Sequence, residues 1–254
     1  MKVLDLPAPW SDSPYLLGEH GLADVLRAWS ADDALVAMLA GPGRGSGLVG
    51  LGDPPAVARL CGQAAEDGGD VLATARFATL ERGSFEAMPA DLPSRLGFAA
   101  EGSSWDWMWT PAELTGDPTG AERLALGPET AAEVAECLSR AHPTASTTPD
   151  DDRLIGWWGV RQHGRLMAVI GAILFAPGLP PHLVSLGVDP VTRGQGLAGV
   201  VMSAAVRDCL RVVPDVGRPM VSLGLYATND VARKVYTRLG FGLPHHFSSR
   251  RRDA

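Results

Sequence analysis

The 254-residue sequence has few cysteines, and none of them forms a short paired motif. Cys61, Cys137 and Cys209 are odd in number, widely spaced and set in apolar or helical stretches. A disulfide scaffold needs an even, dense set of cysteines, and a zinc site or a thiol nucleophile needs nearby partners. We therefore expect three reduced core thiols and no bound metal.

Basic charge and long apolar runs are also scarce. The net charge is −7, with 22 Lys and Arg against 29 Asp and Glu, and the one basic run is Arg250–Arg252. This balance argues against a nucleic-acid partner, and we interpret the three arginines as a solvated tail, with an anion contact as the alternative. No segment has the apolar length that spans a bilayer, and the opening residues lack a signal-peptide pattern, so we expect no membrane partner and a cytoplasmic location.

A proline- and glycine-rich segment, PAELTGDPTGA at residues 111–121, separates two parts that each look self-contained. Such composition is typical of a domain boundary. The sequence predicts one domain over residues 1–115 and a second over residues 121–254.

Apolar periodicity predicts alternating strands and helices in the second part. Pro128 suits a first helical turn, His163-Gly164 suits a two-residue hairpin turn, and Gly240 suits a helix end. The expected strands are 122–126, 155–162, 165–175, 182–188 and 220–226, and the expected helices are 128–140, a segment beginning at 197, and 230–239. One more strand is expected in the last residues, and the fold class is α/β.

The run Arg193-Gly-Gln-Gly196, called the glycine turn below, lies between a predicted strand and the start of a helix. Glycines let a backbone turn expose its N–H groups, and a helix N-terminus adds partial positive charge, so such a turn binds anions. The letters from Gly194 to Gly199 also spell the dinucleotide pattern GxGxxG. A dinucleotide fold places that pattern directly after its first strand, with an acidic residue about 20 positions on. Neither condition holds here, so an NAD-type site is the weaker alternative.

Two motifs resemble those of the GCN5-related N-acetyltransferase (GNAT) superfamily. Residues Arg193–Ala198 match its [Q/R]xxGx[G/A] signature, and Asn229–Phe241 resembles its NxxAxxxYxxxGF block. The resemblance covers about residues 121–247. It implies a GNAT-type mixed sheet flanked by helices and acetyl-CoA as co-substrate.

The resemblance also implies a cofactor site in which two strands separate around the pantetheine arm. The backbone of Leu186, Gly187 and Val188 would then bond pantetheine. The pyrophosphate would be held by the segment of Arg193, Gly194, Gln195, Gly196, Leu197, Ala198 and Gly199, with Asn229 as a further cofactor-binding residue. Arg193 suits a phosphate contact, although a solvated turn residue is its alternative.

Amine acylation needs a base for the incoming amine and an acid for the departing thiolate. Tyr236 aligns with the tyrosine that commonly serves as the acid in the family, and a phenol stays protonated at neutral pH. A tyrosine packed in the core is the alternative. The usual glutamate base is replaced by His182, which would act as base or else be an exposed turn histidine, with water or another residue taking the role.

The first part contains a short echo of the second. Ser94–Phe98 (SRLGF) resembles Thr237–Phe241 (TRLGF), and Asp53-Pro54 falls where the second part has Asp189-Pro190. The glycine turn is missing, and Pro93 stands in the place of Tyr236. The sequence thus predicts two GNAT-like halves in tandem, the first a degenerate, structural copy.

The predicted function is acetyl transfer from acetyl-CoA to a primary amine by direct attack in a ternary complex. A small-molecule amine is the favoured acceptor, and a protein N-terminus is an alternative. The alternative is a CoA-binding sensor or partner protein that transfers nothing. Asp150–Asp152 would attract a cationic amine or form a solvated loop. Of Trp157 and Trp158, on adjacent positions of one strand, one would face the acceptor cleft and the other the core. A homodimer is possible.

Overall fold

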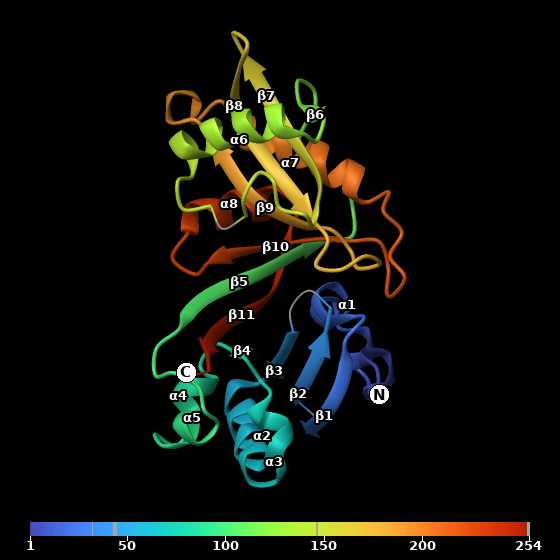
Figure 1. Ribbon diagram of the computed structural model, residues 1–254, viewed down its shortest axis with the longest axis vertical. Coiled ribbons are helices and arrows are strands. Elements are labelled where there is room, and N and C mark those ends of the chain that lie inside the picture. Colours follow the sequence, from blue (N-terminus) through green and yellow to red (C-terminus); the bar gives the residue numbers. More distant parts are fainter. Residues whose placement is uncertain (32, 43–44, 146, 253–254) are drawn as a thin grey trace. The chain divides into compact units, whose positions relative to one another are not determined.

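The computed structural model describes residues 1–31, 33–42, 45–145 and 147–252 (Figure 1). Backbone contacts divide the chain into two compact units, each described separately below. The first unit comprises Met1–Trp107, Leu225–Asp230 and the residues from Leu243 onward, and the second comprises Met108–Gly224 and Val231–Gly242. The division therefore does not follow one cut in the sequence, because the C-terminal segment packs with the first unit.

The first unit is a sheet with helices. Its elements are the 3-10 helices η1 (Val3–Asp5) and η2 (Trp10–Asp12), then α1 (Pro14–His20), β1 (Asp24–Ala31), β2 (Ala34–Gly41), β3 (Gly45–Gly52), α2 (Pro54–Asp67), α3 (Gly69–Ala73), β4 (Phe77–Glu81), α4 (Ser84–Ala87), α5 (Leu92–Arg95) and β5 (Ser103–Thr110). Strands β1, β2 and β3 pair antiparallel, and β4 pairs parallel with β3. The end of β5 belongs to the second unit.

Helix α2 begins with a side-chain cap and a proline. The Asp53 carboxylate accepts the amide of Ala56 at 3.1 Å, and Pro54 occupies the first turn, where its missing N–H costs nothing. The buried face of α2 includes Val57 and Cys61, which join the core of this unit. Burial raises the pKa of the Cys61 thiol to about 12. All three cysteines are free and buried, as predicted.

The last strand, β11 (Gly242–Arg251), completes the sheet of the first unit by pairing antiparallel with β4. The Arg252 side chain donates to the carbonyls of Ala75, Leu72 and Leu96, and the Arg250 guanidinium lies 4.0 Å from the centre of the Phe85 ring. The interpretation of the terminal arginines as a solvated tail is thus wrong for Arg250 and Arg252. Local composition gave no sign that a distant strand would bind this segment.

The second unit carries the elements expected from apolar periodicity. They are β6 (Glu122–Leu124), α6 (Pro128–Ala141), β7 (Leu154–Gln162), β8 (Arg165–Ile173), β9 (His182–Val188), η3 (Pro190–Thr192), α7 (Leu197–Cys209), β10 (Val221–Tyr226) and α8 (Asp230–Leu239). Strands β6 to β9 pair antiparallel in chain order, and β10 runs parallel to β9. The predicted hairpin turn is confirmed, since His163 (φ 52°) and Gly164 (φ 77°) both have positive φ. The mixed α/β sheet flanked by helices confirms the predicted fold class.

Both tryptophans of β7 are buried, so the expectation that one faces a cleft is wrong. Trp157 packs with Val134 of α6 and donates to the Pro149 carbonyl at 3.2 Å, whereas Trp158 donates to Asp208 of α7 at 2.9 Å. Helices α6 and α7 cover the two sides of the strands (Figure 1). Each side of β7 therefore faces a helix.

The two units repeat the same order of elements. In the first, three antiparallel strands lead into α2 and a parallel strand, and in the second, β7, β8 and β9 lead into α7 and the parallel strand β10. The predicted correspondence between Asp53-Pro54 and Asp189-Pro190 agrees with this order, because each pair directly follows the third strand. In the described ranges, no helix combines the length and apolar character needed to cross a bilayer.

Candidate functional site

Strand β9 contains a bulge that sequence reasoning missed. Val184 pairs with Gly171 and Gly187 with Val169, so two residues of β9 face a single residue of β8. At the bulge Ser185 adopts a φ of +54°, a left-handed conformation that is uncommon for a residue with a side chain. Its hydroxyl donates to the Thr147 carbonyl at 3.3 Å. A serine in a strand has no sequence mark that would reveal this geometry.

Strands β9 and β10 pair only at one end. Their parallel register comprises His182 with Ser222 and Leu183 with Leu223, and it extends no further in the described part of the chain. The β10-facing edge of Leu186–Val188 therefore has no strand partner there. This arrangement agrees with the expected separation of the two strands and offers backbone groups to an extended ligand.

The glycine turn connects η3 to α7 and is open to solvent. Gly194 and Gly196 have φ values of 81° and 80°, and a Cβ atom built on either residue would meet nothing within 4 Å. Helix α7 begins directly after the turn, so the amides of Leu197, Ala198 and Gly199 are first-turn amides without acceptors inside the helix. These groups and the helix dipole form an anion-binding arrangement.

Two exposed side chains of the turn contact neighbouring elements. The Arg193 guanidinium donates to the carbonyls of Val188 at 3.4 Å and Ala141 at 3.3 Å, so it lies over the ends of β9 and α6. The Gln195 side chain accepts from Gln162 at 3.4 Å. These hydrogen bonds are long and therefore weak, so either side chain could turn toward an anion with little loss of hydrogen-bond energy.

An ion pair lies beneath the turn. Arg140, near the end of α6, donates from Nε to the Asp189 carboxylate at 2.7 Å. That carboxylate is buried and also accepts the Val191 amide at 3.2 Å. The hydrogen bond from Arg140, followed by that from the Val191 amide, lowers the pKa of Asp189. The corner between β9 and η3 thus carries a charged, hydrogen-bonded anchor that sequence reasoning did not identify.

Tyr236 lies on α8 with only 8% of its surface exposed. Its ring packs 6.2 Å from that of Phe241, and its hydroxyl has no hydrogen-bond partner among the described residues. Burial raises the pKa of Tyr236 to about 12. The phenol therefore keeps its proton throughout the neutral range, as a proton donor must.

His182 begins β9 at the end where β9 and β10 pair. The side chain is buried, with Nδ1 2.9 Å from the Ser222 hydroxyl and the ring centre 4.8 Å from that of Phe175. The alternative of an exposed turn histidine is therefore wrong. Its role as general base stays a prediction.

Asn229 directly precedes α8 and belongs to the first unit, where its amide donates to the Tyr226 carbonyl at 2.9 Å. The side chain is exposed. Its part in cofactor binding also stays a prediction.

Acidic side chains line a hollow of about 440 Å³ beside the start of α6. Asp150, Asp151 and Asp152 form part of its wall, together with Pro128 and Leu154. Asp151 already holds Arg153 through two hydrogen bonds of 2.9 and 2.6 Å. Within the described ranges, no three metal-ligating side chains come together.

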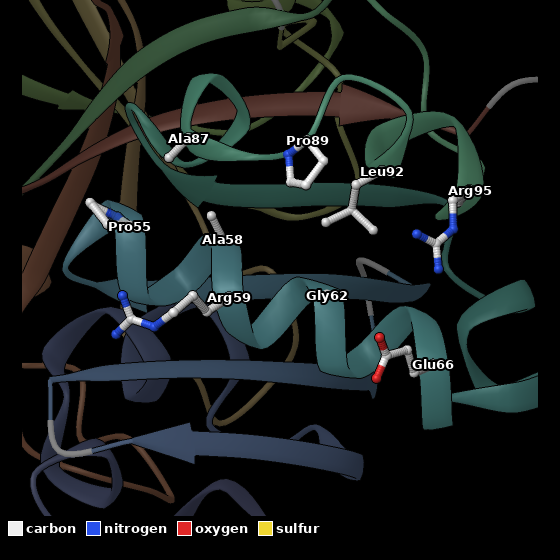
Figure 2. A pocket seen from close by; sticks show the side chains of 9 residues that line it. All are labelled: Pro55, Ala58, Arg59, Gly62, Glu66, Ala87, Pro89, Leu92 and Arg95. Carbon is white, nitrogen blue, oxygen red and sulfur yellow. The ribbon is translucent and has the colours of Figure 1, made fainter.

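The first unit has a hollow of its own, of about 420 Å³, between α2 and the α4–α5 segment. Figure 2 shows Arg59 toward one end and Glu66 and Arg95 toward the other, with Ala58 and Leu92 among the apolar residues between them. Helix α2 starts immediately after Asp53, without a glycine turn. The hollow therefore lacks the anion-binding backbone that marks the second unit.

A mixed sheet with a bulged strand, partly separated parallel strands and a glycine turn at a helix N-terminus is an arrangement suited to an extended ligand that bears phosphate. The sequence model of the acetyltransferase (GNAT) family matches residues 107–241, which is more than half of the chain. The chain belongs to the GNAT acetyltransferase family, whose chemistry is acyl transfer. The match includes both motifs singled out in the sequence.

Solved structures share the fold over most of the chain. A GCN5-related N-acetyltransferase from Kribbella flavida is 18% identical with a TM-score of 0.50, covering 94% of this chain and 93% of that one. A GNAT-family acetyltransferase from Colwellia psychrerythraea is 13% identical with a TM-score of 0.50, covering 89% and 84%. A Drosophila protein is 18% identical with a TM-score of 0.52, covering 86% and 74%. At these identities the similarity concerns the fold alone, and no curated protein matched the sequence.

Proposed function

We propose that this protein transfers an acetyl group from acetyl-CoA to a primary amine by direct attack in a ternary complex. The observation that carries the proposal is the open glycine turn at the start of α7, beside a strand pair that is joined at one end only. The residues that build it lie in the second unit.

Acetyl-CoA fits the chemistry of this site. The amides of Leu197, Ala198 and Gly199 and the partial charge of the α7 N-terminus would hold the pyrophosphate. The β10-facing backbone of Leu186–Val188 would bond the amides of the pantetheine arm. Arg193 would add a cation beside the phosphates.

The reaction forms a carbon–nitrogen bond and breaks the carbon–sulfur bond of the thioester. The amine must give up a proton before or during attack, and the CoA thiolate must receive one. Tyr236 would supply the second proton, since its buried phenol stays protonated and its hydroxyl is not engaged by any described residue. His182 would accept the proton of the amine, directly or through water.

The first unit would act as a degenerate copy of the same fold without chemistry of its own. The repeated element order supports this interpretation, as does the direct start of α2 at Asp53-Pro54. A small amine acceptor would be consistent with the acidic wall of Asp150–Asp152, and a homodimer stays a prediction.

The first test is calorimetric titration of acetyl-CoA into the wild type and the Gly196→Glu variant. Gly196 has a positive φ and open space, so the substitution adds backbone strain and a carboxylate at the anion site. Gly120→Glu is the matched control, because Gly120 also has a positive φ, of 95°, and a Cβ atom there would meet nothing within 4 Å. Gly120 lies in the loop before β6, and strands β7 and β8 separate β6 from β9. We expect binding by the wild type and the control, and none by Gly196→Glu. A folded wild type that binds no acetyl-CoA would refute the proposal.

Turnover separates the enzyme from a CoA-binding sensor. Release of free CoA thiol would be followed with a panel of small amines, including cationic and neutral ones. Acceleration by at least one amine supports transfer. Tight acetyl-CoA binding without amine-dependent thiol release across the panel would favour the sensor.

A further inference from the structure

We propose that Arg140 is a positioning residue for the glycine turn, acting through Asp189 to hold the phosphate-binding amides in place. The inference rests on the proposed acetyl-CoA site and names a residue outside both family-like motifs. Arg140 lies on α6, 49 positions before Asp189.

Arg140 uses its whole guanidinium to join three elements. Its Nε donates to Asp189 at 2.7 Å, Nη2 donates to the Leu166 carbonyl of β8 at 3.1 Å, and Nη1 donates to the Glu136 carboxylate one turn earlier in α6 at 2.8 Å. The Arg140 side chain is 23% exposed and that of Asp189 5%. A pair this shielded holds its geometry far better than a surface ion pair.

Asp189 transmits this constraint to the turn. One carboxylate oxygen binds Arg140 and the other accepts the Val191 amide at 3.2 Å, while the Asp189 amide donates to the Met167 carbonyl at 2.8 Å. Both sides of the β9–η3 corner are therefore fixed. The glycine turn begins only four residues after Asp189. Because its glycines are flexible, the turn does not fix its own direction, and the β9–η3 corner sets the direction of the turn.

The end of α6 has little room to move. A Cβ atom on Gly187 would lie 3.0 Å from Leu138 and 3.1 Å from Ala141, so α6 packs closely on β9. Ala141, the residue after Arg140, accepts from Arg193 of the turn. Two successive residues of α6 thus contact the corner and the turn.

We expect loss of the Arg140–Asp189 pair to weaken acetyl-CoA binding and to leave the chemical step unchanged. Without the pair, Asp189 would be a buried carboxylate lacking its main partner, and the corner would shift or loosen. The amides at the start of α7 would then be poorly aligned with phosphate oxygens. The reacting centre, with Tyr236 on α8, would be unaffected, so KM for acetyl-CoA should rise while kcat stays near its original value.

The test compares Asp189→Asn, Arg140→Met and Arg140→Lys with a control. Asparagine at position 189 keeps an oxygen that can accept from the Val191 amide but loses the negative charge. At position 140, methionine keeps only the aliphatic part of the side chain, and lysine keeps the positive charge without the several donors of a guanidinium. Arg165→Met is the control, because it removes the other arginine bound to Glu136, at 3.1 Å, and leaves the hydrogen bonds between Arg140, Asp189 and Val191 in place. Calorimetry gives the affinity for acetyl-CoA, steady-state kinetics separate KM from kcat, and thermal unfolding checks the fold.

We expect Asp189→Asn and Arg140→Met to weaken acetyl-CoA binding about tenfold with kcat changed less than about twofold, and Arg140→Lys to restore part of the affinity. The control should bind as the wild type does. If the wild type binds acetyl-CoA and folded variants bind it equally well, the inference is overturned and the proposed function stands. If a folded wild type binds none, the proposed function is overturned and the inference falls with it. A fall in kcat without a change in KM would also contradict a role of Arg140 in positioning the glycine turn.

Discussion

The segments β3–α2–β4 and β9–α7–β10 have the same order and the same parallel pairing, but the second has an open glycine turn before its helix and the first does not. In the first, β3 and β4 pair over four positions, and Asp53 caps α2 directly. In the second, pairing stops after two positions, and Asp189 caps a 3-10 turn that leads into the glycine turn. The proposed binding site therefore depends on an inserted turn and a shorter strand pairing.

Side chains maintain the difference between the two segments. A Cβ on Gly47 of β3 would lie 2.4 Å from the Phe77 ring of β4, so that ring fills the space over the paired strands. Gly194 and Gly196 have nothing within 4 Å of such an atom. Glycine therefore serves close packing at Gly47 and an open backbone at Gly194 and Gly196.

The largest expected effect on catalysis comes from Tyr236, whose place in the predicted degenerate copy is taken by Pro93. Tyr236→Phe keeps the ring against Phe241 but removes the proton donor, so kcat should fall about 100-fold with little change in acetyl-CoA affinity. Pro93→Ala, as control, should leave kcat unchanged. Equal effects of the two substitutions, measured by thiol release, would contradict the division of labour between the units.

The pH profile gives a second measurement on the same residue. Because burial raises the pKa of Tyr236 to about 12, the protonated, donating form persists across the neutral and moderately alkaline range. The alkaline fall in kcat due to loss of this proton should therefore appear only as the pH approaches about 12. A tyrosine-dependent fall centred near the ordinary phenol value of about 10 would refute the buried donor.

Sequence could predict what local residues determine. The start of α6 at Pro128, the hairpin turn at His163-Gly164 and the end of α8 at Gly240 each follow from the conformational preference of a few neighbouring residues. The glycine turn was found for the same reason.

Distant contacts could not be predicted in this way. The pairing of Arg140 with Asp189, the positive φ of Ser185 and the burial of both tryptophans of β7 depend on which helix or strand lies opposite. The placement of β11 beside β4 joins residues about 170 positions apart. Periodicity predicts that an element exists but does not specify its partner.

A smaller effect is expected at His182, where the two strands of the second unit still pair. His182→Gln removes the titratable ring but keeps groups that can bond the Ser222 hydroxyl, so the fold should be retained. If His182 is the base, kcat at neutral pH should fall at least about tenfold, while acetyl-CoA binding stays unchanged. An unchanged kcat across the pH range would assign the proton transfer to water or another residue.

The smallest expected effect on acyl transfer comes from Arg252, although its effect on stability is measurable. The side chain donates to three backbone carbonyls of the first unit and lies 5.2 Å from the centre of the Phe98 ring, so it fastens the end of β11 to that unit. Arg252→Ala should reduce the free energy of unfolding of the first unit by about 2 kcal/mol, since hydrogen bonds from a charged donor are lost. Arg251→Ala is the matched control, because Arg251 is the exposed neighbour on the same strand. Urea unfolding, followed by tryptophan fluorescence, measures the difference, and calorimetry should show that both variants bind acetyl-CoA as the wild type does. If Arg252→Ala is as stable as Arg251→Ala, the contacts of Arg252 with the carbonyls contribute nothing to stability. If Arg252→Ala loses acetyl-CoA binding, the site depends on the first unit more than the comparison of the two segments implies.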